Sequence, residues 1–401
     1  MKAAKVARAA RGESARHERQ GPVKVKAAVL YGPGTKYQVE EIELDPPGES
    51  EVLVRFAASG MCHSDEHLVT GDLVADPSRT PGAVRQFPMI AGHEGAGVVE
   101  ETGPGVTGLR PGDHVVTSFI PSCGTCPSCA SGQQNLCDLG ATLTRGRQQD
   151  GTARHHTADG TDCALMCSLG TFAEYSVVNQ GSLVKIPAHL PLEPAALVAC
   201  GVTTGWGSAV YAAQVRPGDT VVVIGAGGVG MNAVQGAAAA GARQVVAVDT
   251  VAFKREQALA FGATHTAASI GEAVGLVNEI TWGRNADRVI LTVGLADGAM
   301  IAPMMAMVRK GGRAVVTAIA NMYDADVTLS LADLTLMGKQ LVGTIFGSAN
   351  PRYDIPRLLA LYEAGKLKLD ELITRTYTLD QINEGYQDMR DGRNIRGVIR
   401  Y

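Results

Sequence analysis

The chain has almost no excess of charge of either sign. Its 36 Lys and Arg residues stand against 40 Asp and Glu residues, which gives a formal net charge of −4. Binding to nucleic acid or to an anionic membrane surface depends on clustered positive charge, so this balance disfavours both kinds of partner.

Long apolar runs and a secretory signal segment are lacking as well. The longest apolar runs fall far short of the roughly 20 residues that a membrane-spanning helix needs. Hydrophobic residues make up 45% of the 401-residue chain and charged residues 19%, as in ordinary soluble proteins. Without a signal segment, a secreted disulfide-bonded protein is disfavoured and a cytoplasmic location is expected. At about 150 residues per domain, the length predicts two domains.

The amino end differs from the rest of the chain in charge. Residues 1–26 contain eight Lys and Arg residues but only two acidic ones, Glu13 and Glu18. We predict that residues 1–23 form a basic, solvated extension. An organellar transit peptide, a polyanion-binding arm and an upstream start codon are the alternatives.

Four of the eight cysteines fall within fifteen residues. Cys123, Cys126, Cys129 and Cys137 have the spacing Cys-x2-Cys-x2-Cys-x7-Cys. Four thiolates at this spacing can surround one tetrahedral metal ion, and a site closed in this way has a structural role. An iron–sulfur cluster is the main alternative. A zinc ribbon for nucleic acid is disfavoured by the acidic balance of the chain.

Glycine and proline clusters divide the rest of the chain into two kinds of structure. Residues 24–200 contain short β-type runs between such clusters and are predicted to form an irregular, mostly β domain; the runs are 26–30, 51–57, 97–100 and 114–118. In residues 201–345 buried strands alternate with helices, which indicates a parallel sheet; the strands are 220–224, 244–248, 288–293 and 313–319. Residues 346–401, with a helix at 355–364, return to mixed structure. We therefore expect one domain to be inserted into the other.

A Gly-x-Gly-x-x-Gly motif follows the first of these parallel strands. The strand at 220–224 runs into Gly225, Gly227 and Gly230, and a helix follows at 231–240. In a dinucleotide site, such glycines allow a tight turn, close approach of the backbone to the pyrophosphate and close packing of helix on strand. The loop residues assigned to the cofactor are Gly225, Gly227, Gly228, Val229 and Gly230.

An acidic residue follows at the spacing that a dinucleotide site requires. Asp249 ends the second strand nineteen residues after Gly230, where its carboxylate can accept a hydrogen bond from a ribose 2′-hydroxyl. A 2′-phosphate would be repelled there, so NAD is favoured over NADP. Lys254 is the nearest cation for the adenosine ribose or phosphate. The alternative to a dinucleotide site is an ordinary glycine-rich turn with Asp249 as a cap. The alternative role for Lys254 is that of an exposed lysine on a helix.

A second set of possible metal ligands is dispersed along the chain. Two cysteines and one histidine, Cys62, His93 and Cys200, would leave a fourth coordination position for water or substrate, as catalytic zinc requires. Spacing alone does not show that residues more than a hundred positions apart converge. A buried cysteine that acts as a small hydrophobic residue is the alternative.

These motifs together resemble the zinc-dependent medium-chain alcohol dehydrogenases. The resemblance extends from about Lys24 to Tyr401 and rests on Cys62–His67, Gly92-His93-Glu94, the four-cysteine segment, Cys200 with Thr203-Thr204-Gly205, the glycine-rich loop and Gly392–Arg396. It implies an α/β fold with a GroES-like, mostly β catalytic domain and a Rossmann coenzyme domain with a doubly wound parallel sheet.

Several segments are similar to one branch of that family, the nitrosodimethylaniline (NDMA)-dependent enzymes. The segments are 62–68, 118–124, 217–220, 346–351 and 394–400. Members of the branch are bacterial nicotinoproteins, in which NAD(H) stays bound through turnover and is reoxidised in place by another electron carrier.

The resemblance implies a role for each matching residue. Cys62, His93 and Cys200 bind the catalytic zinc, with Glu94 behind the metal and Asp65 orienting His93. In proton transfer, Ser64 takes the proton of the alcohol and His67 passes it towards solvent through the cofactor ribose. The residues implied for the cofactor are His63, Thr204, Asp249, Lys254, Val293 and Arg396, and those for an apolar substrate pocket are Leu73 and Phe119.

The implied activity is oxidation of a primary alcohol by an enzyme with two zinc ions per subunit and bound NAD(H). An external electron acceptor, with mycofactocin as the candidate, and a homo-oligomer are also implied. The alternatives are an NAD-exchanging alcohol dehydrogenase, a thiol-dependent formaldehyde dehydrogenase and a silent dinucleotide-binding protein. Apolar Leu73 and Ala141 disfavour the thiol adduct, and the complete set of site residues disfavours the silent protein.

Some features match no complete motif. Thirty residues separate Cys62 from His93, and the excess over compact relatives falls around 74–86, where it is expected to reshape the pocket mouth or a subunit contact. Cys163, Cys167, His155 and His156 are predicted to fill loops or the core, with a redox or extra metal role as the alternative.

Overall fold

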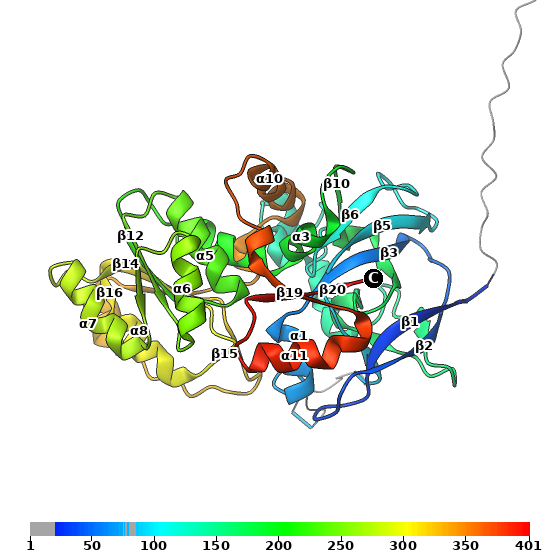
Figure 1. The fold of residues 1–401 in the computed structure, drawn as a ribbon, viewed down its shortest axis with the longest axis horizontal. Helices are drawn as coiled ribbons and strands as arrows, with labels where there is room; N and C mark the ends of the chain where they lie inside the picture. The colour runs from blue at the N-terminus through cyan, green and yellow to red at the C-terminus, as the bar shows by residue number, and fades with distance from the viewer. Residues whose placement is uncertain (1–20, 75, 77, 80–85) are drawn as a thin grey trace, which may run out of the picture.

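The structure is a computed structural model, and it describes residues 21–74, 76, 78, 79 and 86–401. Nearly all of the expected basic extension and much of the 74–86 segment lie outside the described residues. Two bodies lie side by side, one built on a parallel sheet and the other mostly β (Figure 1).

The mostly β body contains two sheets. Their strand orders are β7-β2-β1-β4-β8 and β10-β6-β5-β3-β20-β19, with β9 beside β3. The strands are β1 Val23–Leu30, β2 Gln38–Leu44, β3 Glu51–Gly60, β4 Met89–Ile90, β5 Glu94–Thr102, β6 His114–Thr117, β7 His155–His156, β8 Ala164–Leu165, β9 Tyr175–Asn179, β10 Leu183–Ile186, β19 Ile373–Tyr377 and β20 Arg396–Arg400. Strand β20 pairs antiparallel with β3, so the carboxyl end of the chain lies in this body.

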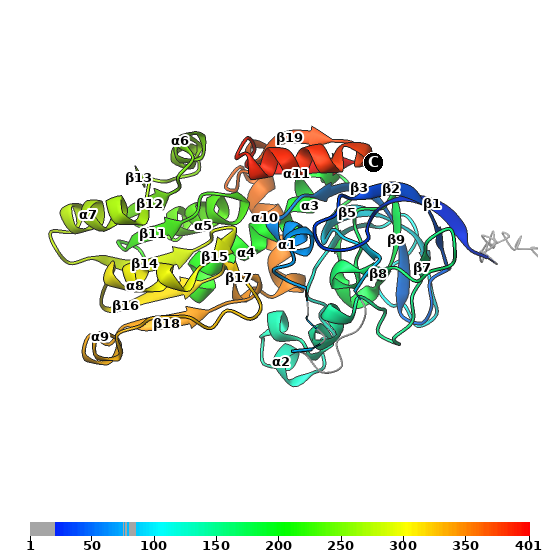
Figure 2. The same cartoon turned by 90° about the horizontal axis from the view of Figure 1, so that it is seen from below.

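The second body is a six-stranded parallel sheet with helices on its faces (Figure 2). The strand order is β13-β12-β11-β14-β16-β18, which is the doubly wound arrangement with the first strand near the middle. Its strands are β11 Thr220–Ile224, β12 Gln244–Val248, β13 His265–Ala267, β14 Ala286–Leu291, β16 Val308–Val316 and β18 Gln340–Gly343, and its helices include α5 Gly228–Ala239, α6 Ala252–Ala260, α7 Ile270–Ile280 and α8 Ile301–Ala306. The predicted α/β fold with a parallel Rossmann sheet is confirmed.

Sequence patterns located the central strands better than the outer ones. Strands 220–224 and 244–248 lie at the predicted residues, while 288–293 and 313–319 overlap β14 and β16. Strands β13 and β18 were missed. Both are short strands at the edges of the sheet. Their sequences, His-Thr-Ala in β13 and Gln-Leu-Val-Gly in β18, lack the longer apolar run that marks a buried strand.

Helices α3 Leu192–Ala196 and α4 Gly201–Gly207 join the two bodies. The largest cluster of buried apolar side chains contains Ala58 from β3, Val221 from β11 and residues of both helices. Helix α4 lies against α5 so closely that a Cβ on Gly205 would be 2.0 Å from the Val229 carbonyl oxygen. The residue before α4, Cys200, is therefore placed at the junction of the two bodies.

The remaining elements are short or peripheral. The helices are α1 His63–Thr70, α2 Pro127–Ala130, α9 Leu331–Leu336, α10 Pro351–Glu363 and α11 Ile382–Arg390, and the strands are β15 Leu295–Ala296 and β17 Ile319–Ala320. Three-residue turns of 3-10 helix are Gln134–Leu136, Met166–Ser168, Gln180–Ser182, Leu197–Ala199, Gly298–Met300, Phe346–Ser348, Asp370–Leu372 and Leu379–Gln381. Asp138–Arg145 is a longer 3-10 segment, and Ser208–Ala212 is a π turn.

Among the described residues, no single helix has the length and apolar character to cross a membrane. One helix pair, Leu192–Ala199 with Gly201–Ala212, satisfies length and composition criteria when taken together, but it bends by 53°.

Candidate active site

Three segments distant in the sequence bring four metal-ligand side chains together. Cys62 precedes α1, His93 and Glu94 stand at the start of β5, and Cys200 precedes α4. One ligand atom from each of these four residues lies within 4.8 Å of the others. Two thiols, an imidazole and a carboxylate in a largely buried cluster are a donor set that fits zinc.

The two thiols of this cluster interact directly. The Sγ of Cys200 hydrogen-bonds the Sγ of Cys62, and this bond, with the nearby His93 and Arg396, lowers the pKa of Cys62 well below its usual value in spite of burial. The same interaction, together with burial, raises the pKa of the Cys200 thiol well above its usual value. A metal ligand must be a thiolate, so metal binding would have to displace the proton that this pair of thiols holds.

Asp65 orients the imidazole of His93. The Nδ1 of His93 lies 3.2 Å from Asp65 Oδ1, which also accepts a hydrogen bond from the Gly92 amide at 2.8 Å. Because a carboxylate accepts only, Nδ1 carries a proton and Nε2 is left as the ligand atom. This is the role that the resemblance implied for Asp65.

Arg396 links the metal-ligand cluster to the glycine-rich loop. Its Nη2 donates to Glu94 and, at 3.0 Å, to the Met61 carbonyl, and the Arg396 side chain is 4% exposed. A Cβ on Gly201 would lie 2.2 Å from Nη1 of this side chain, and a Cβ on Gly228 would lie 2.2 Å from its Cδ. Arg396 therefore lies between the cluster and the amino end of α5, where a pyrophosphate would bind.

The glycine-rich loop has the geometry that its sequence predicts. Gly225 has a φ of 95°, and a Cβ on Gly230 would lie 1.7 Å from the Gly225 carbonyl oxygen. The Asp249 carboxylate lies beside the loop and accepts hydrogen bonds from the amides of Ala226, at 2.8 Å, and Val251, at 2.9 Å. Larger side chains at Gly225 or Gly230 would therefore displace the nucleotide turn.

Two other residues assigned to the cofactor lie close to the glycine-rich loop or to the residues beside it. Val293 is next to Gly225, because a Cβ on that glycine would be 2.7 Å from the Val293 amide nitrogen. His63 packs against Gly294 in the same way, and burial lowers its pKa, so the imidazole is neutral at pH 7. Lys254 is half-buried on α6.

The residues predicted for proton transfer, Ser64 and His67, both lie on α1. Ser64 Oγ is 3.6 Å from Cys62 Sγ. On α4, Thr204, which was predicted to contact the cofactor, has its Oγ1 3.9 Å from Cys200 Sγ. His67 reaches across to the second body, where its Nε2 lies 2.8 Å from the Gly294 carbonyl oxygen. Its Nδ1 faces Asp72, a residue that the sequence analysis missed. The sequence did contain a sign of this contact, because Asp72 directly follows Gly71, the residue that ends the helix.

One of the two predicted pocket residues lies next to the metal-ligand cluster. The ring of Phe119 contacts His93 edge-on at 6.0 Å between centroids, and Phe346 at 4.6 Å. Phe346 was not singled out from the sequence. Leu73 packs on the apolar cluster that contains Met61 and Phe172, and its contact with substrate stays a prediction.

The four clustered cysteines also converge. The Sγ atoms of Cys123, Cys126, Cys129 and Cys137 lie within 4.8 Å of one another. Backbone amides donate to the sulfurs, for example Cys126 N to Cys123 Sγ at 3.3 Å and Cys129 N to Cys126 Sγ at 3.4 Å. The amides of Thr125 and Cys126 lower the pKa of Cys123 to about 6. This all-thiol donor set fits a closed tetrahedral zinc site.

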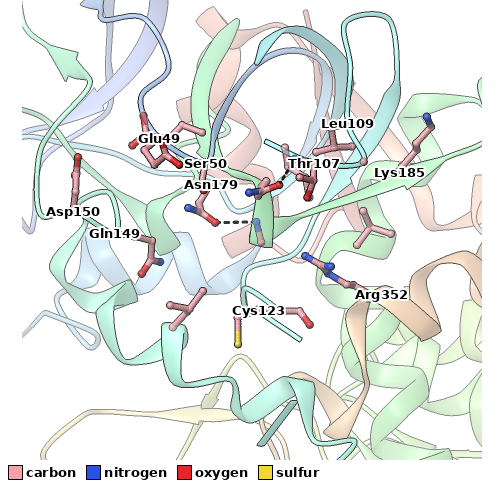
Figure 3. A pocket seen from close by; sticks show the side chains of 18 of the residues that line it. Glu49, Ser50, Thr107, Leu109, Cys123, Gln149, Asp150, Asn179, Lys185 and Arg352 are labelled. Atoms are coloured by element: carbon pink, nitrogen blue, oxygen red, sulfur yellow. Dashed lines mark hydrogen bonds between the residues drawn. The ribbon is translucent and has the colours of Figure 1, made fainter. Parts of the chain in front are cut away.

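A cavity of about 810 Å³ lies beside this cysteine lobe rather than at the catalytic cluster. Figure 3 shows Glu49, Cys123, Asn179, Lys185 and Arg352 around it. Its lining contains none of the residues predicted for catalysis or for the nucleotide.

Two of the unassigned residues are buried in the mostly β body, apart from both clusters. Burial raises the pKa of the Cys163 thiol to about 12 and lowers the pKa of His155 to about 3. His155 Nε2 is 3.0 Å from the hydroxyl of Ser176. A neutral histidine and a protonated thiol are ordinary core residues, in line with the role predicted for them.

Both halves of the chain match known protein families. Residues 48–188 match the alcohol dehydrogenase GroES-like domain, and residues 228–364 match the zinc-binding dehydrogenase family. The chain therefore belongs to the zinc-binding medium-chain alcohol dehydrogenases, and it is an alcohol dehydrogenase.

Individual relatives cover almost the whole chain. An NDMA-dependent alcohol dehydrogenase of Amycolatopsis methanolica is 55% identical over 377 residues, which span 94% of this chain and 99% of the relative. A putative alcohol dehydrogenase D of Mycobacterium tuberculosis is 54% identical and covers 94% of this chain and all of its own length. The crystal structure of benzyl alcohol dehydrogenase from Acinetobacter calcoaceticus superposes with a TM-score of 0.85 at 29% identity, over 94% and 99% of the two chains.

Proposed function

We propose that this alcohol dehydrogenase oxidises primary alcohols to aldehydes with a tightly bound NAD that an external electron acceptor reoxidises in place. The observation that carries the proposal is the convergence of Cys62, His93 and Cys200 beside the nucleotide loop. The similarity to an NDMA-dependent relative supports the bound cofactor and the external acceptor. Mycofactocin is the proposed natural acceptor.

The residues of the chain divide the work of the reaction. Cys62, His93 and Cys200 would hold the catalytic zinc, which would supply a Lewis acid for the alcohol oxygen, and bound NAD would supply the hydride acceptor. Ser64 takes the hydroxyl proton of the alcohol, and His67 accepts a proton and releases it to water. The rings of Phe119 and Phe346, which contact each other next to His93, would form an apolar wall beside the reacting carbon.

The nucleotide is proposed to bind along the loop from Gly225 to Gly230, with its pyrophosphate at the amino end of α5 next to Arg396. The Asp249 carboxylate would accept a hydrogen bond from the ribose 2′-hydroxyl, which favours NAD over NADP. Lys254 would contact the adenosine half of the cofactor. His63, Thr204 and Val293 would complete the site on the nicotinamide side.

A second zinc ion is proposed for the four clustered cysteines, which gives two ions per subunit. We also propose that the chain divides into a basic extension at 1–23, a catalytic domain at 24–200 and 346–401, and a coenzyme domain at 201–345. A cytoplasmic location and the absence of nucleic-acid and membrane partners stay predictions from the sequence.

Protein purified and desalted without added nucleotide is expected to retain about one NAD(H) per subunit. The bound NADH is measured by absorbance and fluorescence, followed by benzyl alcohol oxidation with NDMA and no added NAD. Turnover under these conditions supports a permanently bound cofactor. Empty protein that works only with free NAD would show an exchanging dehydrogenase, and activity only with formaldehyde and a thiol would show the thiol-dependent reaction.

A loop variant provides the control for nucleotide retention. In Gly230→Val, the first added carbon would lie 1.7 Å from the Gly225 carbonyl oxygen, so the turn has to open. The variant is expected to purify without nucleotide while it retains both metal ions.

A homo-oligomer is the proposed assembly. Large apolar side chains are exposed along one segment of the second body: Met322, Val327, Leu331, Leu336, Met337 and Ile345. The segment includes α9 and the edge strand β18, which lie together at one side of the sheet (Figure 2). Exposed apolar surface and an open strand edge are both typical of a subunit contact.

The double variant Leu331→Glu, Leu336→Glu is expected to lower the molar mass of the assembly in size-exclusion chromatography with light scattering. The two glutamates would oppose the contact because it would bury their charges. Both positions are highly exposed in the single chain, at 71% and 81%, so the subunit itself tolerates the charges. Leu259→Glu, at an exposed position on α6, is the control and is expected to leave the mass unchanged. A monomeric unaltered protein would contradict the proposed assembly.

A further inference from the structure

The imidazole of His67 lies between two hydrogen-bond acceptors. Nε2 is 2.8 Å from the Gly294 carbonyl oxygen, and Nδ1 is 3.1 Å from Asp72 Oδ2. The residue is 4% exposed, so water competes little for either nitrogen. The two acceptors therefore compete to decide which ring nitrogen carries the proton when the imidazole is neutral.

Asp72 is held in place from both bodies of the molecule. Thr70 Oγ1 donates to Asp72 Oδ2 at 2.5 Å, and this bond together with that from His67 lowers the pKa of Asp72. The Met322 amide of the second body donates to the Asp72 carbonyl at 3.1 Å. The amide of the next residue, Leu73, is bonded to the His67 carbonyl at 3.2 Å, which fixes the turn. The carboxylate is thus an ionised and positioned acceptor.

A carboxylate is the stronger of the two acceptors. A hydrogen bond to an ionised acceptor is roughly twice as strong as one to a neutral carbonyl. In the neutral ring the proton therefore stays on Nδ1 and faces Asp72, so the lone pair is on Nε2. Without Asp72, the Gly294 carbonyl would hold the proton on Nε2 and leave the lone pair on the wrong atom.

We propose that Asp72 is a positioning residue that fixes the His67 tautomer, so that Nε2 is the atom that accepts the proton. Its role in turnover rests on the proposed function. The O–H bond of the alcohol breaks, a proton passed on from Ser64 forms an N–H bond at Nε2, and the same nitrogen later releases a proton to water. Asp72 stays a carboxylate throughout and stabilises the imidazolium form while His67 holds the proton.

The other charged groups around this pair do not oppose the assignment. His63 is a titratable neighbour of His67, and burial lowers its pKa, which disfavours a second positive charge beside the His67 ring. Lys254 acts on His63 from α6. Among the described residues, Asp72 is the carboxylate that hydrogen-bonds the ring of His67.

The tautomer can be measured without any activity. We would label the full-length protein with 15N-histidine and record the ring nitrogen shifts, with the His67 signals assigned by their loss in His67→Gln. At alkaline pH, the proton is expected on Nδ1 in the unaltered protein and on Nε2 in Asp72→Ala. A proton on Nε2 in the unaltered protein would overturn the assignment.

A nearby carboxylate provides the matched control. Asp76 lies four residues further along, and its Oδ1 accepts hydrogen bonds from the amide and hydroxyl of Ser78, at 2.9 and 2.7 Å. Asp76→Asn is therefore expected to leave the His67 tautomer and the rate of alcohol oxidation unchanged.

The effect on turnover separates a positioning role from a structural one. With benzyl alcohol and NDMA, Asp72→Ala is expected to lower kcat by about tenfold or more, with KM changed by less than about twofold. Asp72→Glu, which keeps a carboxylate, is expected to restore part of the lost kcat. An unchanged kcat in Asp72→Ala would overturn the role in turnover. If the unaltered protein oxidised no alcohol but carried the expected tautomer, the proposed function would fail and the tautomer assignment would stand.

Discussion

Cys62→Ser is expected to abolish alcohol oxidation, lowering the rate by at least about a thousandfold, and to remove one of two metal ions per subunit. Cys62 is one of the two thiols in the metal-ligand cluster, and its pKa is lowered beside Cys200 and His93, which favours the thiolate that a metal ligand requires. A serine hydroxyl stays protonated at neutral pH and binds zinc weakly. Loss of a Lewis acid costs several kcal/mol of transition-state stabilisation, and each 1.4 kcal/mol is about a factor of ten in rate. Elemental analysis and initial rates with benzyl alcohol measure both effects.

A second cysteine variant controls for the chemistry of the substitution. Cys163 is 1% exposed, lies in the core of the mostly β body and belongs to neither cysteine cluster. Cys163→Ala is expected to retain both metal ions and near-normal activity. If Cys62→Ser retained full metal content and rate, the assignment of the catalytic zinc ligands would be wrong.

Cys129→Ser is expected to remove the other metal ion and to lower the melting temperature by about 10 °C. The fully buried apolar side chains of this lobe are few: Ile120, Phe346, Cys129 and Cys137. With so little apolar burial, the proposed metal ion would supply much of the free energy that folds the lobe. A loss of several kcal/mol in a chain of this size corresponds to a shift of this order in melting temperature. Calorimetry and elemental analysis are the measurements.

The same variant is expected to leave the catalytic metal in place but to reduce activity in part. Phe346 packs on the cysteine lobe and also contacts Phe119, whose ring lies next to His93. Ser128→Ala, on the same short helix, is the control because Ser128 is not a ligand. An unchanged metal content and melting temperature in Cys129→Ser would refute a structural metal site at these cysteines.

Features carried by neighbouring residues could be predicted from the sequence. The glycine-rich loop, the strands at its two sides and Asp249 lie within thirty residues of one another, and each of them occupies its predicted position. Residues this close in the chain have few ways to be arranged, because backbone geometry restricts them locally. The four-cysteine lobe was predictable for the same reason.

Features that depend on distant residues could be predicted only through the resemblance or not at all. Cys200 is 107 residues beyond His93, and nothing in the spacing shows that their side chains meet. The contact of Phe346 with Phe119 crosses more than two hundred residues. The edge strands β13 and β18 were missed because pairing with a neighbouring strand, rather than an apolar run, makes them strands.

By itself, the sequence determined the parallel nucleotide-binding unit, the cysteine lobe and the residue types of a zinc-dependent alcohol dehydrogenase. Each of these features depends on residues that are close together in the chain. Only the tertiary structure decided that Cys62, His93, Glu94 and Cys200 form one cluster, and that His67 lies between Asp72 and Gly294. The physical reason is that ligand geometry and the choice of protonated nitrogen depend on distances of a few ångströms. Packing of the two bodies sets such distances, and spacing along the chain does not.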